Sequence, residues 1–254
     1  MLIRLFSTDL DGTILGNPEA AWRFTQAWDS LPAARRPLLV YNTGRTVSDT
    51  QSIVAARQLP TAEFIIGSVG TELHHTLYNW GGEFAAQFSA CWSLERVEEI
   101  VGAIPDVRRQ MAAGACHPFK SSWFWTRARP EEIGKLEQQL AEAGIEATVI
   151  YSCRYFLDIV PACAGKGRAL VWLCHRLSIE MPEVLVAGDS GNDNAMFQLP
   201  GVNGIIVENA LPELLAGKHG GQTYVARRPM ADGVLEGLAH FGVLTNASAS
   251  VLTD

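Results

Sequence analysis

The sequence predicts an α/β protein with a Rossmann-like, doubly wound parallel sheet as its core and an inserted α+β cap domain. Short, mostly apolar runs alternate with segments of helical periodicity, as in parallel sheets that helices cover on both faces. Several of these runs end in Asp, Thr or Gly, and one central stretch breaks the alternation. The 254 residues leave room for one large or two modest domains.

The first apolar run, 2–6, is followed by two acidic residues. Asp9 and Asp11 are separated by one residue, and Gly12 and Thr13 come next. As a strand end, this segment would lie at the edge where open α/β sheets bind ligands. Two carboxylates this close repel each other, so a cation or a proton on one of them must compensate. A polar turn is the alternative interpretation, since Asp and Gly are common in turns.

A similar pattern follows the next apolar run. A helix is predicted from Pro18, because Asn17 can cap it. The second buried strand, 38–41, ends shortly before Thr43 and Gly44, where another helix begins. Backbone N–H groups at a helix start favour an anion, although capping by Thr explains the same pattern.

The third strand, 63–66, leads into a glycine-containing segment, 67–72, which we interpret as a tight turn. From residue 84 the pattern changes to two amphipathic helices and three strands, which lie at 94–104, 121–127, 133–140, 146–151 and 154–160. None of these strands ends in an acidic pair. We therefore predict a cap domain at 84–160 and a core domain composed of 1–83 and 161–254.

The core pattern resumes after Pro161. Lys166 opens a predicted helix, where its positive charge is unfavourable because it opposes the helix dipole. A nearby anion would offset this cost, and a side chain that reaches solvent is the alternative explanation. The buried strand 184–187 then leads to Asp189 and Asp193, which resemble ligands of a hard cation. An acidic turn is again the alternative.

Composition excludes several classes of protein. The formal net charge of −7 argues against a nucleic-acid partner, which would require a basic surface. Five cysteines, with no C-x-x-C pair, indicate neither a disulfide framework nor a zinc site. No apolar run is long enough to span a membrane and no leader is recognisable, so we expect a cytoplasmic protein without a membrane partner.

The strand-end residues should meet at one edge of the sheet, because parallel strands share the edge at which they end. This places Asp9, Asp11, Thr43, Lys166 and the 189–193 acids together. Such a set contains a nucleophile, a second acid, a hydroxyl, a cation and metal-binding acids. It suits phosphoryl transfer, which requires an in-line nucleophile and positive charge around the phosphoryl oxygens.

The motifs DLDGT, NTGR, GKG and GDSGND, which begin at residues 9, 42, 165 and 188, resemble the four motifs of the haloacid dehalogenase-like phosphohydrolase superfamily. The resemblance implies a magnesium-dependent phosphatase that forms an aspartyl-phosphate. Asp9 would be the nucleophile, and Asp11 the general acid and base. We expect the cap to bury Asp11. Mg²⁺ would bind Asp9, the backbone carbonyl of Asp11, and Asp189, with Asp193 as a ligand or as support.

The resemblance also assigns phosphate binding to Thr43, Gly44, Lys166 and Asn192. Asn209 matches a position that steadies the lysine and the phosphate site.

The spacing of the motifs narrows the choice of subfamily. Only 29 residues separate Thr13 from Thr43, but 122 separate Thr43 from Lys166, which is room for a cap after the second motif. The segments IRLFSTDLDGT, KSSWFW and VAGDSGNDNAMF resemble the sucrose-phosphate phosphatase group, including mannosylfructose-phosphate phosphatases. Sucrose phosphatases often have Asn where this chain has Gly12.

The resemblance thus implies hydrolysis of a disaccharide monophosphate of the mannosylfructose-phosphate or sucrose-6-phosphate type. The predicted sugar contacts are Arg45 and Glu72 at the hinge, and Lys120, Ser122 and Arg154 in the cap. Lys120 and Arg154 could equally be solvated charges. The alternatives are a phosphatase for another sugar phosphate, such as glucosylglycerol-phosphate or a hexose phosphate, and a catalytically silent module. A sugar-phosphate synthase is a candidate partner.

Overall fold

The structure, a computed structural model, describes residues 2–89, 92–111 and 117–244. It contains a seven-stranded sheet in the order β11-β10-β9-β1-β2-β3-β4 and a four-stranded sheet in the order β5-β6-β8-β7. The strands of the large sheet are β1 (Leu5–Thr8), β2 (Leu38–Asn42), β3 (Phe64–Gly67), β4 (Glu72–His75), β9 (Val184–Gly188), β10 (Asn203–Ile206) and β11 (Thr223–Val225).

All neighbouring strands of the large sheet are parallel except β3 and β4. The predicted α/β class and the parallel core are therefore confirmed. Strand β4 was not predicted, because four residues of mixed polarity follow the turn at 67–70 and carry no strand signal of their own. It pairs antiparallel with β3 and forms one edge of the sheet.

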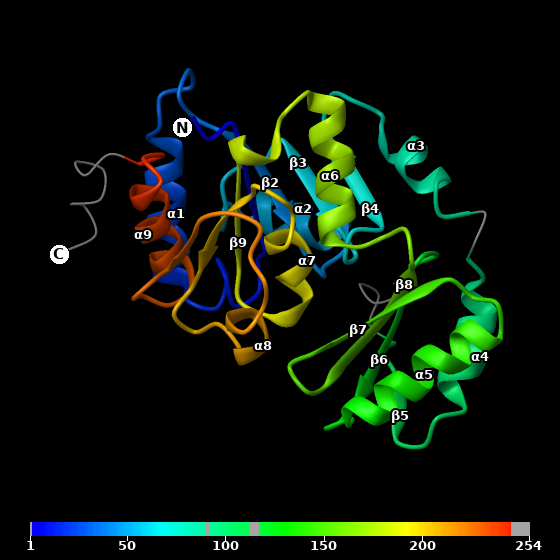
Figure 1. The fold of residues 1–254 in the computed structure, drawn as a ribbon. Helices are drawn as coiled ribbons and strands as arrows, with labels where there is room; N and C mark the ends of the chain where they lie inside the picture. Colours follow the sequence, from blue (N-terminus) through cyan, green and yellow to red (C-terminus); the bar gives the residue numbers. More distant parts are fainter. Residues whose placement is uncertain (1, 90–91, 112–116, 245–254) are drawn as a thin grey trace.

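Helices cover both faces of the large sheet (Figure 1). One face packs against α1 (Pro18–Asp29), α2 (Val47–Ala55) and α9 (Met230–His240), and the other against α3 (Gly81–Ala86), α6 (Lys166–Leu177) and α7 (Asn194–Phe197). The short helices η2 (Met181–Glu183) and α8 (Pro212–Leu215) complete the core. In β1, the alternation of side chains sends Leu5 to one apolar cluster and Phe6 to the other.

The second module consists of a sheet with two helices on one face (Figure 1). Its elements are α4 (Leu94–Gly102), β5 (Val107–Arg109), β6 (Ser121–Trp125), α5 (Pro130–Glu142), β7 (Ala147–Ser152) and β8 (Phe156–Pro161). Strand β5 was not predicted, since its three residues, VRR, contain a single apolar side chain. A separate apolar cluster, including Val97, Trp123 and Leu136, holds the helices to this sheet.

The division of the chain at residues 84 and 160 stays a prediction. Phe84 and Phe88 pack in an apolar cluster of the large sheet, which favours a boundary somewhat after residue 88. The β7–β8 hairpin reaches back to the core, where β7 contacts η3 (Gly191–Asp193). The chain then passes from β8 to α6 through residues 162–165.

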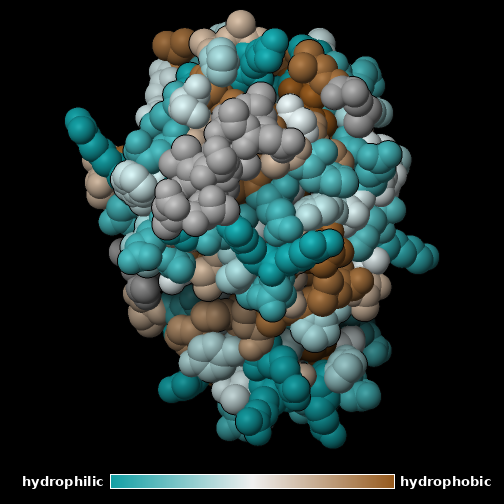
Figure 2. Space-filling view, turned by 90° about the vertical axis from the view of Figure 1, so that its left-hand side faces the viewer, coloured by the Kyte–Doolittle hydropathy of each residue, from teal (hydrophilic) through white to brown (hydrophobic). Residues whose placement is uncertain are grey.

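The surface beside α1 and α9 is mostly hydrophilic, with small, separate apolar patches on its visible part (Figure 2). In the described part of the chain, no helix combines the length and apolar character needed to cross a lipid bilayer.

Gly70 provides a test of how the turn after β3 supports the site. Its φ is +85°, and a Cβ at this position would lie 2.4 Å from the carbonyl carbon of Gly165, the residue before Lys166. We expect Gly70→Ala to lower the midpoint of thermal unfolding by several degrees, since about 1–3 kcal/mol of strain accompanies such a conformation. Gly82→Ala is the control, because a Cβ added at residue 82 would have no neighbouring atom within 4 Å. Equal midpoints for both variants, measured by circular dichroism, would contradict this prediction.

Candidate active site

Three adjacent strands bring the predicted residues to one edge of the large sheet. β1 leads to Asp9, β2 to Thr43 and β9 to Asp189, and β1 lies between the other two strands. Asp9 and Thr43 are buried, and Asp189 is 9% exposed. The convergence expected from the parallel topology is therefore seen in the structure.

Lys166 lies at the centre of this group. Its ammonium donates hydrogen bonds to Asp9 Oδ1 at 2.7 Å, to Asp193 Oδ1 at 2.7 Å and to Asn192 Oδ1 at 3.1 Å. The side chain is completely buried. Burial lowers the pKa of Lys166, but Asp193 and Asp9 outweigh this effect and raise that pKa above its ordinary value. Lys166 therefore carries a positive charge inside the protein.

Asp193 stabilises the conformation of the loop after β9. Asp193 Oδ2 accepts hydrogen bonds from the backbone N–H groups of Asp189 and Ser190, at 3.1 and 3.2 Å. Its other oxygen is bound to Lys166. Both oxygens thus have protein partners, which favours support of the site over direct metal binding for this residue.

The carboxylates can form a site for a hard cation. Asp9, Asp189 and Asp193 each offer an oxygen, and these atoms lie within 4.8 Å of one another. Gly12, with a φ of +84°, brings the backbone against this cluster, and a Cβ there would lie 2.4 Å from Asp189 Oδ2. Oxygen donors of this kind suit Mg²⁺, so the residues present fit the predicted ion.

Negative charge exceeds positive charge in this cluster. Burial raises the pKa of Asp9 to about 8 against the opposing charge of Lys166, and the other carboxylates add to the rise. Burial and the neighbouring Asp193 likewise raise the pKa of Asp189 to about 7. Thr13 offsets part of the cost by donating a hydrogen bond to Asp189 Oδ1 at 3.2 Å. Lys166 alone does not compensate these carboxylates, and a bound cation would remove the repulsion that remains between them.

Asp11 does not lie where we expected it. Its side chain is 55% exposed and forms a two-pronged ion pair with Arg45, with Nε–Oδ2 and Nη2–Oδ1 distances of 2.7 and 2.6 Å. The predicted burial of Asp11 under the cap is therefore wrong for this structure. Arg45, a predicted sugar contact, is paired with Asp11 in this structure.

Asn209 also differs from the prediction. It donates to the Gly12 carbonyl at 2.8 Å and accepts from Met230 N–H at 2.8 Å. It thus fastens the Gly12 turn to α9 and has no described contact with Lys166. The sequence could not show this, because the partners are far apart in the chain.

The three predicted sugar contacts in the cap differ in their surroundings. Lys120 is 5% exposed, not solvated, and donates to the Gly44 carbonyl at 3.0 Å, directly beside Thr43. Ser122 donates to Asp158 Oδ1 at 2.5 Å. Arg154 is exposed at the tip of the β7–β8 hairpin.

At the hinge, Glu72 connects the core to the cap. One oxygen accepts from Val47 N–H at 2.6 Å, and the other lies 3.1 Å from His117 Nε2. Thr71 Oγ1 is 3.2 Å from the other ring nitrogen of His117. We did not predict His117, since a single histidine before an aromatic strand gives no signal of its partners.

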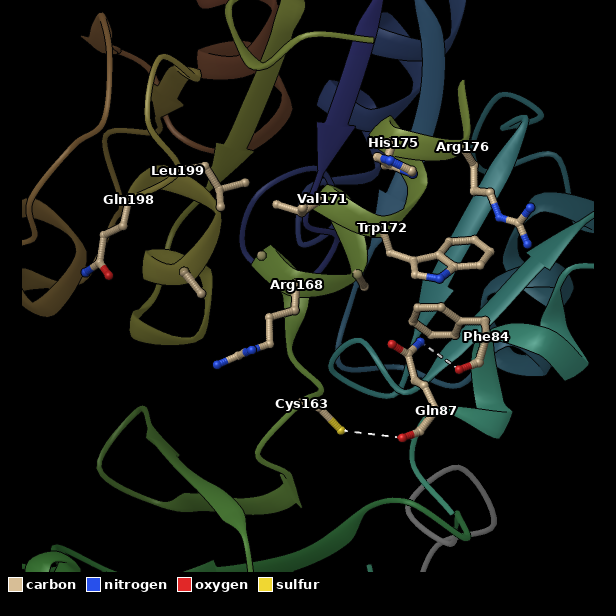
Figure 3. Close-up of a pocket in the computed structure, with 13 residues that line it drawn as sticks. Phe84, Gln87, Cys163, Arg168, Val171, Trp172, His175, Arg176, Gln198 and Leu199 are labelled. Atoms are coloured by element: carbon tan, nitrogen blue, oxygen red, sulfur yellow. Dashed lines mark hydrogen bonds between the residues drawn. The ribbon is translucent and has the colours of Figure 1, made fainter. Parts of the chain in front are cut away.

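A cavity of about 650 Å³ lies between α6, α3 and α7, away from the carboxylates (Figure 3). Phe84 and Trp172 form its aromatic side, and the Arg176 guanidinium lies 5.0 Å from the centre of the Trp172 ring. None of the carboxylates described above lines it, so we place the chemistry at the strand-end cluster.

The chain matches a family model over residues 2–242, that of sucrose-6F-phosphate phosphohydrolase. The chain belongs to this family. The matched range includes every residue of the strand-end cluster, and the chain is accordingly a phosphoric monoester hydrolase, a sugar-phosphate phosphatase of the sucrose-phosphatase type. The catalytically silent alternative is set aside.

Individual relatives agree with this assignment. The chain is 40% identical to the mannosylfructose-phosphate phosphatase of Agrobacterium fabrum, over 95% of this chain and 98% of that protein. It is 31% identical to sucrose-phosphatase 1 of Nicotiana tabacum, over 97% of this chain but only 61% of the plant protein. The sucrose-phosphatase of Synechocystis sp. PCC6803, solved with sucrose and phosphate, superposes with a TM-score of 0.85 at 29% identity, covering 95% of this chain and 99% of that one.

The raised pKa values of Asp9 and Asp189 predict how pH and Mg²⁺ affect stability. Both carboxyls have an ordinary pKa of 3.8, so between about pH 4 and pH 8 the folded protein binds protons that the unfolded chain releases. The free energy of unfolding without metal should therefore fall as pH rises through this window. Added Mg²⁺ should raise the unfolding midpoint more at about pH 8.5 than at about pH 6, because protons compete with the ion.

The measurement is differential scanning calorimetry with EDTA or Mg²⁺ at the two pH values. Asp189→Asn is the matched variant, and its response to Mg²⁺ should be smaller at both. An equal Mg²⁺ effect at both pH values in the wild type would contradict the prediction.

Proposed function

We propose that the chain is a magnesium-dependent phosphatase that hydrolyses a disaccharide monophosphate through an aspartyl-phosphate on Asp9. The observation that supports this most directly is the buried contact of Asp9 with Lys166, beside the carboxylate of Asp189. A carboxylate held by one buried cation is oriented for attack, and the same cation can neutralise phosphoryl oxygens.

In this mechanism, Asp9 attacks phosphorus and the sugar oxygen leaves with a proton from Asp11. Asp11 then takes a proton from the water that hydrolyses the intermediate. Because Arg45 engages both oxygens of Asp11 in this structure, Asp11 must leave that ion pair to reach the sugar oxygen. Thr43, Gly44, Lys166 and Asn192 bind the phosphoryl oxygens in this proposal.

Asp9, Asp189 and the backbone carbonyl of Asp11 would hold Mg²⁺, with Asp193 supporting the loop. The ion supplies charge stabilisation for the phosphoryl oxygens. Cap closure would exclude water from the site. The residues that stay predicted sugar contacts are Arg45, Glu72, Lys120, Ser122 and Arg154. The association with a synthase also stays a prediction.

The nucleophile is tested by Asp9→Asn. The amide keeps the shape of the side chain but cannot attack phosphorus, so we expect kcat to fall by at least about 10³-fold. Phosphate release from a sugar phosphate measures this, and calorimetry confirms folding. Asp29→Asn, an exposed change on α1, should keep wild-type activity. Retention of more than a tenth of kcat by Asp9→Asn would exclude Asp9 as the nucleophile.

The substrate is tested with a panel of phosphate esters. We expect kcat/KM to be highest for mannosylfructose-phosphate or sucrose 6-phosphate, because contacts remote from phosphorus align the reacting group. Fructose 6-phosphate, glucosylglycerol-phosphate and p-nitrophenyl phosphate complete the panel. If a hexose phosphate or glucosylglycerol-phosphate exceeds both disaccharide phosphates, the substrate assignment is wrong, whereas the phosphatase assignment stands.

A further inference from the structure

Asn42 is a fully buried polar residue at the end of β2, directly before Thr43. Its Nδ2 group donates a hydrogen bond of 3.1 Å to the backbone carbonyl of Lys166 and one of 3.2 Å to Met196 Sδ. Lys166 opens α6, and Met196 lies on α7, the helix that follows Asp193. One side-chain amide therefore connects the three segments that carry Thr43, Lys166 and Asp193.

The orientation of this amide follows from its two acceptors. A carbonyl oxygen and a thioether sulfur can only accept hydrogen bonds, so the NH₂ group of Asn42 must face them and Oδ1 must face elsewhere. Oδ1 is buried and has no hydrogen-bond partner among the residues that the structure describes. A buried acceptor without a partner costs free energy.

Stability alone does not explain an asparagine at this position. Leucine branches at the same carbon atom and would remove the unpaired oxygen. The Lys166 carbonyl, in the first turn of α6, would keep the helical hydrogen bond from the residue four positions later. An apolar side chain of this shape should therefore cost the fold little. What leucine cannot supply is the donor that fixes the Lys166 backbone relative to β2.

The start of α6 is closely packed on two other sides. A Cβ added at Gly70 would lie 2.9 Å from Lys166 N, and a Cβ added at Gly167 would lie 2.3 Å from the Ala195 carbonyl oxygen. The lysine side chain is itself completely buried. A side chain in such surroundings cannot easily change its conformation, so a shift of its backbone would also shift the ammonium.

We propose that Asn42 is a positioning residue for phosphoryl transfer, whose hydrogen bond to the Lys166 carbonyl sets the distance between Thr43 and the Lys166 ammonium. This inference rests on the phosphate-binding roles that the proposed function gives to those two residues. Asn42 is 0% exposed, so it acts through its neighbours and does not touch the substrate. Groups that are held in place before the reaction stabilise the transition state most, and a misplacement of about 1 Å can cost about 100-fold in rate.

The test is Asn42→Leu, with Asn42→Ala as a smaller variant that cannot clash. In the presence of Mg²⁺, kcat should fall by about 10- to 100-fold for whichever phosphate ester the wild type hydrolyses fastest. The Ki of orthovanadate, which mimics phosphorus in the transition state, should rise by about the same factor, and the Ki of inorganic phosphate by about threefold at most. The unfolding midpoint of Asn42→Leu should stay within about 3 °C of wild type.

Asn203 provides the matched control. It is also buried, and its Nδ2 group donates to the carbonyls of Pro182 and Val184 at 2.9 and 3.2 Å. It lies at the start of β10, and therefore at the opposite edge of the large sheet from the strand-end cluster. Asn203→Leu should lower the unfolding midpoint by about 4 °C or more and leave kcat within about twofold of wild type.

A kcat within about twofold of wild type in either Asn42 variant would overturn the positioning role. Equal losses of affinity for orthovanadate and inorganic phosphate would also overturn it, because a general loss of structure affects both ligands alike. A large drop of the unfolding midpoint in both variants would assign the amide to folding instead. Asp9→Asn tests the proposed function separately: if that variant stays active, the proposed nucleophile is wrong, whereas weaker orthovanadate binding by Asn42→Leu still supports the positioning of Thr43 and Lys166.

Discussion

The buried ammonium of Lys166, held between Asp9 and Asp193, is the interaction around which the site is arranged. Its partners are 157 and 27 residues away in the chain, so it connects the first strand of the core to the loop after β9. Moving these charges out of water is costly, and such groups are weak evidence for stability. The proposed function gives a reason for this burial, because the same charges would orient a nucleophile and attract a phosphate. The apolar clusters on both faces of the large sheet offset the cost of this burial.

The core and the position of the site could be predicted from the sequence for a simple physical reason. Buried parallel strands are recognisable as short apolar runs, and their ends must share one edge. Asp9, Thr43 and Asp189 follow the ends of three adjacent parallel strands, as expected. Lys166 opens α6 after a strand of the other sheet, yet its ammonium reaches Asp9 as predicted. Each apolar run is recognised from neighbouring residues alone. The shared edge of the sheet then predicts that residues far apart in the chain lie close together.

What could not be predicted depends on contacts between distant side chains. Asp11 is exposed because Arg45, 34 residues later, holds both of its oxygens. Asn209 fastens the Gly12 turn, 197 residues earlier, instead of the phosphate site. Strands β4 and β5 are too short and too polar to give a strand pattern, and pairing with a neighbour determines them. In each case, contacts with residues that are distant in the chain decide the conformation, and they outweigh the preference of the local sequence.

The passage from β8 to α6 has a mechanical consequence. Only residues 162–165 separate the last strand of the cap from the helix that carries Lys166, and Gly165 has a φ of +123° with no neighbouring atom near its missing side chain. Gly70 packs against the backbone at this point and fixes the core end of the passage. Rotation of the four-stranded sheet would therefore bend this short segment, while the contact with Gly70 would hold the start of α6, and Lys166 with it, in place. The buried charge between Asp9 and Asp193 would then stay the same whether the two modules lie close together or apart.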